Sequence, residues 1–389
     1  MKNKFFSVVI PTKNRPELLR DAISSVLFQN FDNYELIISD NFNNRHTYEV
    51  VAEFKNDPHL KYFRTSSELS MPDHWEWATL KASGKYILVL TDRSVLKQGT
   101  LNKVYDVIKT SKNAAVYSWR WALFDNKRNI VFGDSVTYQD NPRIIKSEDL
   151  ARYFLKSQQR FPYELSRGLN SCYRFDVAEN IRERYGRLFM PISPDFTSAF
   201  LLLSQTDEIY YIDKSLFLSQ GLEIGNGGRN FLSTATPYLK TLKDIDYYLH
   251  VPIKAPILEN IPFDDFLKIQ KLAGGNLRDI KINWVEYFVR CYNELLQKIP
   301  SEFINRNDLA NLWLEFENAL SVFDNKIQKE VRKRMKRLIF SMFKAKIKRS
   351  FFGSFSISFK RYLEFIIKQG FRSSYKNVLE AAGFNSQNL

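Results

Sequence analysis

Residues 6–27 read FSVVIPTKNRPELLRDAISSVL, and this stretch decides the fold class. The apolar, β-branched run Phe5–Ile10 stops at Pro11, as a buried strand of a parallel sheet does. A helix is expected next, with Asn14 as its N-cap, Pro16 in its first turn and apolar residues at helical spacing beyond. A buried strand followed at once by an amphipathic helix is the repeating unit of an α/β fold.

The same alternation continues through the first hundred residues. Further strands are expected at Tyr34–Ser39, Leu60–Arg64 and Tyr86–Leu90, with helices at Tyr48–Phe54 and His74–Ala82. Strands separated by helices predict a mostly parallel mixed sheet between helices, and ligands bind beyond the carboxyl ends of strands in such sheets. The polar residues that follow each strand are therefore the first candidates for a binding site.

Beyond Leu101 the pattern is looser. Ala115–Leu123 and Asn129–Phe132 are expected to be strands, and Pro194–Gln205 a helix. The sequence is rich in helical patterns after about residue 236. We therefore divide the chain into an α/β domain (1–235), a helical region (236–325) and a basic, amphipathic helical region (326–389).

Composition narrows the class of protein. The chain has 389 residues, enough for two or three domains, and its 44% hydrophobic and 26% charged residues exclude wholesale disorder. Its two cysteines, Cys172 and Cys291, form neither a metal-ligand pair nor a disulfide framework, which fits a reducing cytoplasm. No apolar run approaches the roughly 18 residues of a membrane-spanning helix. The net charge of +14 favours partners that carry phosphate.

Most of that charge lies in residues 326–349, which hold eleven basic residues against the single acidic Glu330. Their apolar residues recur at helical spacing on one face: Val331, Met335, Leu338, Ile339, Met342, Phe343 and Ile347. Three roles are open for this helix, namely an anchor at an anionic membrane surface, binding to nucleic acid, and a solvated helix packed on its own domain. We favour the membrane, because the apolar face is continuous, aromatic residues follow, and no nucleic-acid motif accompanies the charge.

Several short motifs, in their order and spacing, resemble family 2 glycosyltransferases of the GT-A fold. They are SVVIPTKNRP (7–16), ELIISDN (35–41), SMPDHWEW (70–77) and ASGKYILVLTD (82–92). The resemblance covers about residues 5–230 and implies a GT-A domain that binds a nucleotide sugar. It does not extend to the helical C-terminal part.

The resemblance also implies donor-binding residues at the strand ends. Pro11, Thr12 and Asp40 stand where the family binds the base, and Arg64 ends the third expected strand. Arg229, in the glycine-rich segment 221–229, is a candidate for binding phosphate or for a solvated loop charge. The full predicted donor set is Pro11, Thr12, Asn14, Arg15, Asp40, Arg64, Asp92, Arg93 and Arg229.

The family's metal site is altered. Family members hold a divalent metal at an Asp-x-Asp motif after the fourth strand, and the metal offsets charge on the leaving diphosphate. Here the segment reads TDRS (91–94), so only Asp92 remains. Three interpretations stay open: Asp92 and the phosphates hold Mn²⁺ or Mg²⁺, Arg93 replaces the cation, or the site is inactive.

An inverting transfer needs a base that faces the acceptor hydroxyl. Asp195, in SPDF (193–196), stands about a hundred residues after Asp92, as the family's base does. Its position at a helix start also gives it a purely structural role as an alternative. Asp73, His74 and Trp75 are predicted acceptor or sugar contacts, with helix capping and core packing as their structural alternatives.

The resemblance thus implies an inverting glycosyltransferase that takes a nucleotide sugar, most simply a UDP-sugar because UDP is the family's commonest nucleotide. Its expected acceptor is a lipid-linked glycan of cell-surface polysaccharide synthesis, met by a cytoplasmic protein at the inner face of the membrane. No nucleic-acid partner is expected. The alternative is an inactive GT-A domain that serves as a membrane-associated scaffold or assembly subunit.

Overall fold

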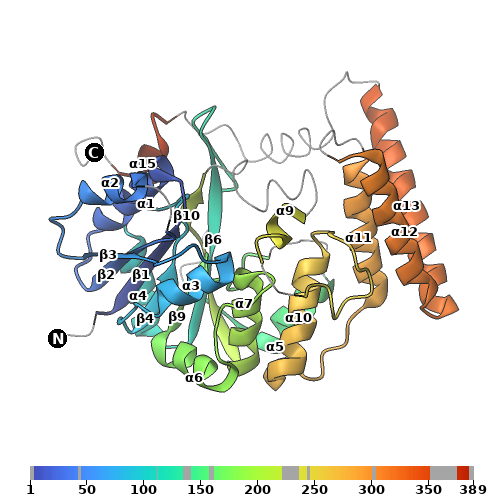
Figure 1. Ribbon diagram of the computed structural model, residues 1–389, viewed down its shortest axis with the longest axis horizontal. Coiled ribbons are helices and arrows are strands. Elements are labelled where there is room, and N and C mark those ends of the chain that lie inside the picture. Colours follow the sequence, from blue (N-terminus) through green and yellow to red (C-terminus); the bar gives the residue numbers. More distant parts are fainter. Residues whose placement is uncertain are drawn as a thin grey trace.

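The computed structural model describes residues 4–42, 45–111, 113–134, 142–156, 162–220, 236–242, 246–299, 304–350 (backbone only from 342) and 375–384. A ten-stranded mixed sheet is formed within residues 6–219, with helices against both faces (Figure 1). The strands are β1 (Phe6–Thr12), β2 (Tyr34–Asp40), β3 (Leu60–Arg64), β4 (Tyr86–Val89), β5 (Ser94–Leu96), β6 (Val116–Asp125), β7 (Ile130–Phe132), β8 (Arg143–Lys146), β9 (Ser171–Arg174) and β10 (Glu208–Ser219).

Helices fill many of the connections between strands and most of the described part of the second half. They are α1 (Pro16–Leu27), α2 (His46–Ala52), α3 (Met71–Thr79), α4 (Thr100–Thr110), α5 (Ser147–Lys156), α6 (Phe175–Tyr185), α7 (Pro194–Gln205), α9 (Thr236–Leu239), α10 (Asn260–Ala273), the 3₁₀ turn η2 (Gly275–Leu277), α11 (Trp284–Lys298), α12 (Arg306–Ser321), α13 (Asn325–Ser350) and α15 (Val378–Ala381). The predicted fold class, an α/β sheet domain followed by a helical C-terminal region, is confirmed.

The strand order is β3-β2-β1-β4-β9-β6-β10-β5, with β7 beside β6 and β8 beside β10. The first four strands pair in parallel, as does β6 with β10, whereas β5, β7, β8 and β9 pair antiparallel. Register places Thr12 opposite Asp40, and Asp40 opposite Arg64. Three predicted donor-binding residues therefore lie side by side at the carboxyl edge.

The start of α1 differs from its predicted form. Its N-cap is Arg15, whose side chain makes no capping bond, and Asn14 has a φ of 58°. Asn adopts this left-handed conformation more readily than most residues with a side chain, so Asn14 shapes the turn out of β1. The predicted capping role of Asn14 is therefore wrong. Pro16 is in the first turn of α1, as predicted.

Gly84 allows the segment before β4 to lie close to the backbone of β1. A Cβ atom on Gly84 would lie 2.7 Å from the Phe6 carbonyl carbon and 2.7 Å from the Ser7 nitrogen. The Gly84 amide also donates to Ser7 Oγ, which in turn donates to the buried carboxylate of Glu35. This polar network joins β1, β2 and the start of β4 at the edge opposite the candidate site.

Alternate side chains of the central strands build two cores. Val8 and Ile10 pack with α1, α2 and α4, whereas Val9 packs with α3 and α7. The second of these cores continues without a break into the helical region, for example where Phe200 of α7 meets Phe266 of α10 at 5.3 Å between ring centroids. Helices α10 to α13 therefore extend the domain on one side (Figure 1).

A third, smaller cluster lies at the β5 edge of the sheet. Val378, Leu379 and Phe384 cover Val95 and Leu218 there, and the Gln98 amide donates to the Ala382 carbonyl. The C-terminal end of the described chain thus lies back beside the N-terminal part of the fold (Figure 1).

The basic segment is helical, as predicted, and forms most of α13. Val331, Met335 and Leu338 of its apolar face pack into the core next to α11, while Ile339 remains 45% exposed. Met342 and the later members of that face, and the aromatic residues 351–365, lie outside the described side chains. No helix in the described part of the chain is both long and apolar enough to cross a bilayer.

Candidate active site

Asp40 ends β2 and is fully buried. Tyr62 donates its hydroxyl to Asp40 Oδ2 at 2.8 Å, and Arg64 Nε lies 3.9 Å from the same oxygen. The other oxygen, Oδ1, has no hydrogen-bond partner among the described residues. Burial raises the pKa of Asp40, against the opposite effects of Tyr62 and Arg64. A buried acceptor without a donor is suited to an N–H group of a ligand.

Asp92 follows β4 and is only 2% exposed. Thr12 donates to its Oδ2 at 3.0 Å, and Arg15 Nη1 donates to its Oδ1 at 3.0 Å. The carboxylate therefore connects the end of β1 and the start of α1 to the loop after β4. Both of its oxygens are engaged within the protein.

Arg93 lies next to this ion pair. Its Nη1 donates to Ser219 Oγ at 3.0 Å and to the Gln220 carbonyl at 3.3 Å, at the end of β10. Burial lowers the pKa of Arg93; Asp92 acts in the opposite direction, and the charges of Arg15 and Arg167 lower it further. The guanidinium groups of Arg15 and Arg167 are thus both close enough to act electrostatically on Arg93.

Asp195 is in the first turn of α7, as expected, and it is held from two sides. Arg167 Nη1 donates to Asp195 Oδ2 at 3.2 Å, and Ser193 donates its hydroxyl to Oδ1. The Arg167 guanidinium lies over Trp121 at 5.1 Å and over Phe196 at 5.7 Å. Burial lowers the pKa of Arg167, which the nearby Asp195 carboxylate opposes. Sequence reasoning missed Arg167, which belongs to no motif.

The cluster Asp73, His74 and Trp75 opens α3. Asp73 accepts from Arg187 at 2.8 Å and bonds to Ser70, the helix N-cap. His74 is buried with Nε2 2.8 Å from Ser39 Oγ, and burial lowers its pKa to about 4, so its ring is neutral at pH 7. Trp75 is buried against Phe189. All of these contacts are internal, and the acceptor contacts of the three residues stay predictions.

The remaining predicted residues divide into two groups. Pro11 is within β1, opposite Ser39, and Asn14 forms the turn already described. Arg64 lies over the Phe42 ring at 5.4 Å, at the rim of the Asp40 site. Arg229 and the glycine-rich segment 221–229 lie outside the described residues.

The described side chains alone do not form a complete site for a divalent metal. They contain no group of three or more His, Cys, Asp or Glu side chains placed to hold an ion. Asp92 is the only carboxylate of the altered motif, and Arg15 and Thr12 engage both of its oxygens. Arg15 and Arg93 bring positive charge next to Asp92 at this edge of the sheet.

Comparisons with known proteins agree with the motifs. The model of the glycosyl transferase family 2 matches residues 7–175. A GalNAc(5)-diNAcBac-PP-undecaprenol beta-1,3-glucosyltransferase of Campylobacter jejuni is 36% identical over 98 residues, 25% of this chain and 32% of the relative. Protein CgeD of Bacillus subtilis is 30% identical over 132 residues, 31% of this chain and 30% of the relative.

The match to each of these curated relatives thus spans about a third of the relative's length or less. Among solved structures, TarS 1-349 of S. aureus in complex with UDP-GlcNAc is 15% identical, with a TM-score of 0.49 over 86% of this chain and 83% of that chain. The family match includes β1 to β4, Asp40, Asp92 and Arg167, and it ends before Asp195. Residues 7–175, a little under half of the chain, are thus similar to the glycosyl transferase family 2.

Proposed function

We propose that the protein transfers a sugar from a nucleotide-diphosphate sugar to an acceptor hydroxyl, with inversion at the anomeric carbon. The observation that carries the proposal is the set of Arg15, Arg93 and Arg167 around Asp92 and Asp195, at the carboxyl edge of a family 2 domain. Ligands of open α/β sheets bind at this edge.

The base of the nucleotide would bind at Asp40. Its buried Oδ1 can accept a hydrogen bond from a ring N–H such as that of uracil, while Tyr62 holds the other oxygen. Arg64 and Phe42, which lie against each other at the rim, can cover the base from the solvent side. UDP is therefore the first nucleotide to test.

The diphosphate would bind to guanidinium groups instead of a metal. Arginine presents a planar set of donors that matches phosphate oxygens, and it stays charged at every physiological pH. Arg15 is 29% exposed in its side chain, so it can turn from Asp92 toward an incoming phosphate. Such donors offset the charge that develops on the leaving nucleotide.

Asp195 would act as the base. The acceptor oxygen attacks the anomeric carbon, its proton passes to the Asp195 carboxylate, and the bond to the nucleotide diphosphate breaks on the opposite face. Arg167 and Ser193 hold the carboxylate in one orientation, so that an oxygen can face the acceptor. General-base catalysis of this kind contributes about 10²–10⁴-fold to the rate.

The test is a binding and transfer assay with a panel of nucleotide sugars, in EDTA and in Mn²⁺. We expect one donor to bind equally well in both, Asp40→Asn to weaken its binding, and Asp195→Asn to leave binding intact but to lower transfer by about 10²-fold or more. Asp149→Asn, on the outward part of α5, is the control. Full transfer by Asp195→Asn would refute the assignment of the base.

A scaffold without activity is the second candidate, favoured by the altered motif and by the internal pairing of Asp92. It predicts that no nucleotide or nucleotide sugar binds under any condition. Binding of even one donor with transfer of its sugar would exclude it.

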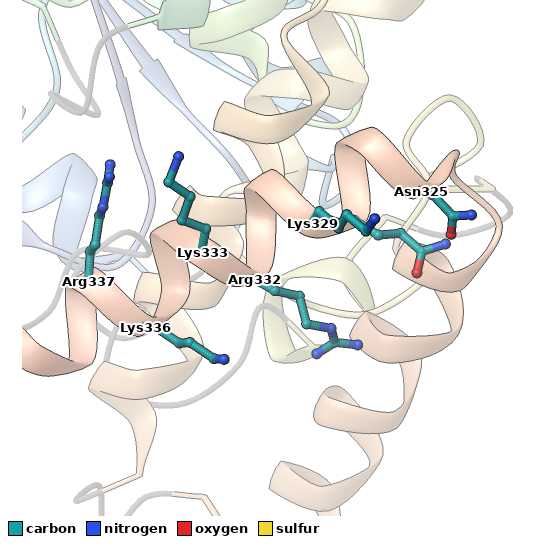
Figure 2. A pocket seen from close by; sticks show the side chains of 7 residues that line it. Asn325, Lys329, Arg332, Lys333, Lys336 and Arg337 are labelled. Carbon is teal, nitrogen blue, oxygen red and sulfur yellow. The ribbon is translucent and has the colours of Figure 1, made fainter.

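We also propose that α13 contacts an anionic membrane surface, where a lipid-linked acceptor would be presented. A shallow groove of about 650 Å³ runs along the helix between Asn325, Gln328, Lys329, Arg332, Lys333, Lys336 and Arg337, and Figure 2 shows how these side chains project from it. Because Val331, Met335 and Leu338 of the described apolar face are packed inside the protein, the contact would depend mainly on charge. The Campylobacter relative, whose name includes PP-undecaprenol, supports a lipid-linked acceptor.

Sedimentation with vesicles of anionic lipid tests this contact. Each basic side chain near such a surface contributes about 1 kcal/mol, so changing Lys329, Lys333, Lys336 and Arg337 to Glu should weaken binding by more than about 100-fold. A control variant with Glu at the exposed lysines 55, 109, 127 and 240 has the same net charge and should still bind. Equal loss in both variants would show a general charge effect.

A further inference from the structure

The loop Met190–Ser193 leads directly into Pro194 and Asp195, and residues from the helical region hold its backbone. Asp265 of α10 accepts the Ile192 amide on Oδ1 at 2.8 Å and the Ser193 amide on Oδ2 at 3.0 Å. Each carboxylate oxygen of Asp265 therefore accepts one hydrogen bond from one of two consecutive amides. Asp265 itself is fully buried.

Two more side chains satisfy the carbonyl groups of the same loop. Lys268, one turn further along α10, donates to the Pro191 carbonyl at 2.7 Å. Tyr238 of α9 donates its hydroxyl to the Ile192 carbonyl at 2.6 Å. We call Tyr238, Asp265 and Lys268 the α9–α10 clamp.

Stability alone is a weak explanation for the clamp. Burying a carboxylate costs free energy unless hydrogen bonds compensate for it, and burial does raise the pKa of Asp265 well above its ordinary value. Two loop amides can also be satisfied by ordered water or by an uncharged side chain, without the cost of burying a charge. What a bidentate carboxylate adds is a fixed backbone geometry at Ile192 and Ser193, directly before Pro194 and Asp195.

We infer that Tyr238, Asp265 and Lys268 are positioning residues for Asp195, which they hold in place through the backbone of Met190–Ser193. The inference rests on the proposed function, and it assigns a role in transfer to a region beyond the family match, which ends at residue 175. The chain of contacts runs from Asp265 to the Ser193 amide, and from the Ser193 hydroxyl to Asp195, whose other oxygen is held by Arg167.

The neighbouring residue offers a matched control. Asp264 is also buried, on the same helix, and its Oδ1 accepts two consecutive amides, those of His250 at 2.6 Å and Val251 at 3.2 Å. Asp264 holds a different loop, which has no described contact with Asp195. Asp264→Asn and Asp265→Asn therefore make the same chemical change at adjacent positions.

The experiment compares these two variants of the full chain by donor binding, steady-state kinetics and hydrogen exchange. Misplacement of a reacting group by about 1 Å costs about 10²-fold in rate, so Asp265→Asn should lower kcat by about 10–100-fold. Donor KM should stay within about twofold, because the donor contacts are untouched. The Ile192 and Ser193 amides should exchange at least about tenfold faster in Asp265→Asn and at the parent rate in Asp264→Asn.

A milder pair covers the case in which Asp265→Asn does not fold. Tyr238→Phe removes only the bond to the Ile192 carbonyl and should lower kcat by about 3–10-fold. Tyr248→Phe is its control, because the buried Tyr248 hydroxyl has no hydrogen-bond partner among the described residues. It should retain the parent kcat.

The outcomes separate the two proposals. If the parent is active, the positioning role would be overturned by an equal change of kcat in Asp264→Asn and Asp265→Asn. An equal change of kcat in Tyr238→Phe and Tyr248→Phe would also overturn it. Unchanged exchange of the Ile192 and Ser193 amides in Asp265→Asn would overturn it whether or not the parent is active. If the parent transfers no sugar from any donor, but the hydrogen exchange of these two amides is still faster in Asp265→Asn, only the proposed function would be overturned.

Discussion

Replacing Asp92 by Asn distinguishes an arginine-based site for the diphosphate from a metal-based one. In the parent, Arg15 Nη1 is held at 3.0 Å by Asp92, whose side chain is only 3% exposed. Arg15 must leave this partner to bind a phosphate through Nη1. The substitution removes the charge that restrains it, and Asn can still accept one hydrogen bond from Thr12.

The size of the effect follows from the strength of that bond. A hydrogen bond to a charged group contributes about 1.5–3 kcal/mol, and the 29% exposure of Arg15 places this pair at the lower end because solvent screens it. Release of about 1.5 kcal/mol corresponds to roughly tenfold tighter binding of UDP. If Asp92 instead holds a metal, the same change should weaken or abolish binding.

Isothermal titration of UDP into both proteins, first in EDTA and then in Mn²⁺, measures the difference. Glu53→Gln is the control, because it frees Arg20 on the same helix from an exposed ion pair away from the site, and it should leave the affinity unchanged. A parent that binds UDP only with Mn²⁺, together with an Asp92→Asn protein that does not bind, would refute the reasoning.

Three further predictions concern stability, each measured by urea unfolding. Burial lowers the pKa of His74 from 6.5 to about 4, so the unfolded chain binds more protons between these values; stability should fall by up to about 3 kcal/mol as the pH falls through that window, and His74→Gln should remove this slope. Gly84→Ala places a Cβ 2.7 Å from backbone atoms of β1 and should cost about 1–3 kcal/mol or more; parent-like stability would contradict the close approach. Lys298→Met leaves the buried Glu294 carboxylate without its cation at 3.2 Å and should cost about 3–5 kcal/mol, whereas Lys333→Met, which breaks an exposed pair, should cost less than about 1 kcal/mol.

The sequence predicted the elements that are defined locally. Leu60–Arg64 and Pro194–Gln205 have the predicted bounds, because a β-branched or aromatic run and a proline-led helix start are visible in a few residues. β10 was missed, since a register shift between Ile212 and Ser215 interrupts its alternation of polar and apolar residues. The insertion of β9 between β4 and β6 was also beyond prediction, because it depends on pairing between distant segments.

The candidate site likewise contains residues that a local pattern identifies and residues that only distant contacts bring into place. Asp40 and Asp92 were found because each follows a recognisable strand, and Asp195 because it opens a recognisable helix. Arg167 was not found, since its importance comes from lying over Trp121 and beside Asp195, neither of which is near it in sequence. Asp265 reads in the sequence as a polar residue of an amphipathic helix, and only the packing of α10 on α7 places it under the loop that leads to Asp195.

The return of residues 375–384 to the β5 edge has a consequence for how the protein is made. Val95 and Leu218 leave the ribosome well before Val378 and Phe384, which cover them. At about 5–20 residues per second, this edge of the nascent sheet waits on the order of ten seconds with apolar side chains uncovered. The first domain therefore cannot finish folding during its own synthesis, and a nascent chain stalled in α13 would expose a surface prone to aggregate or to recruit a chaperone.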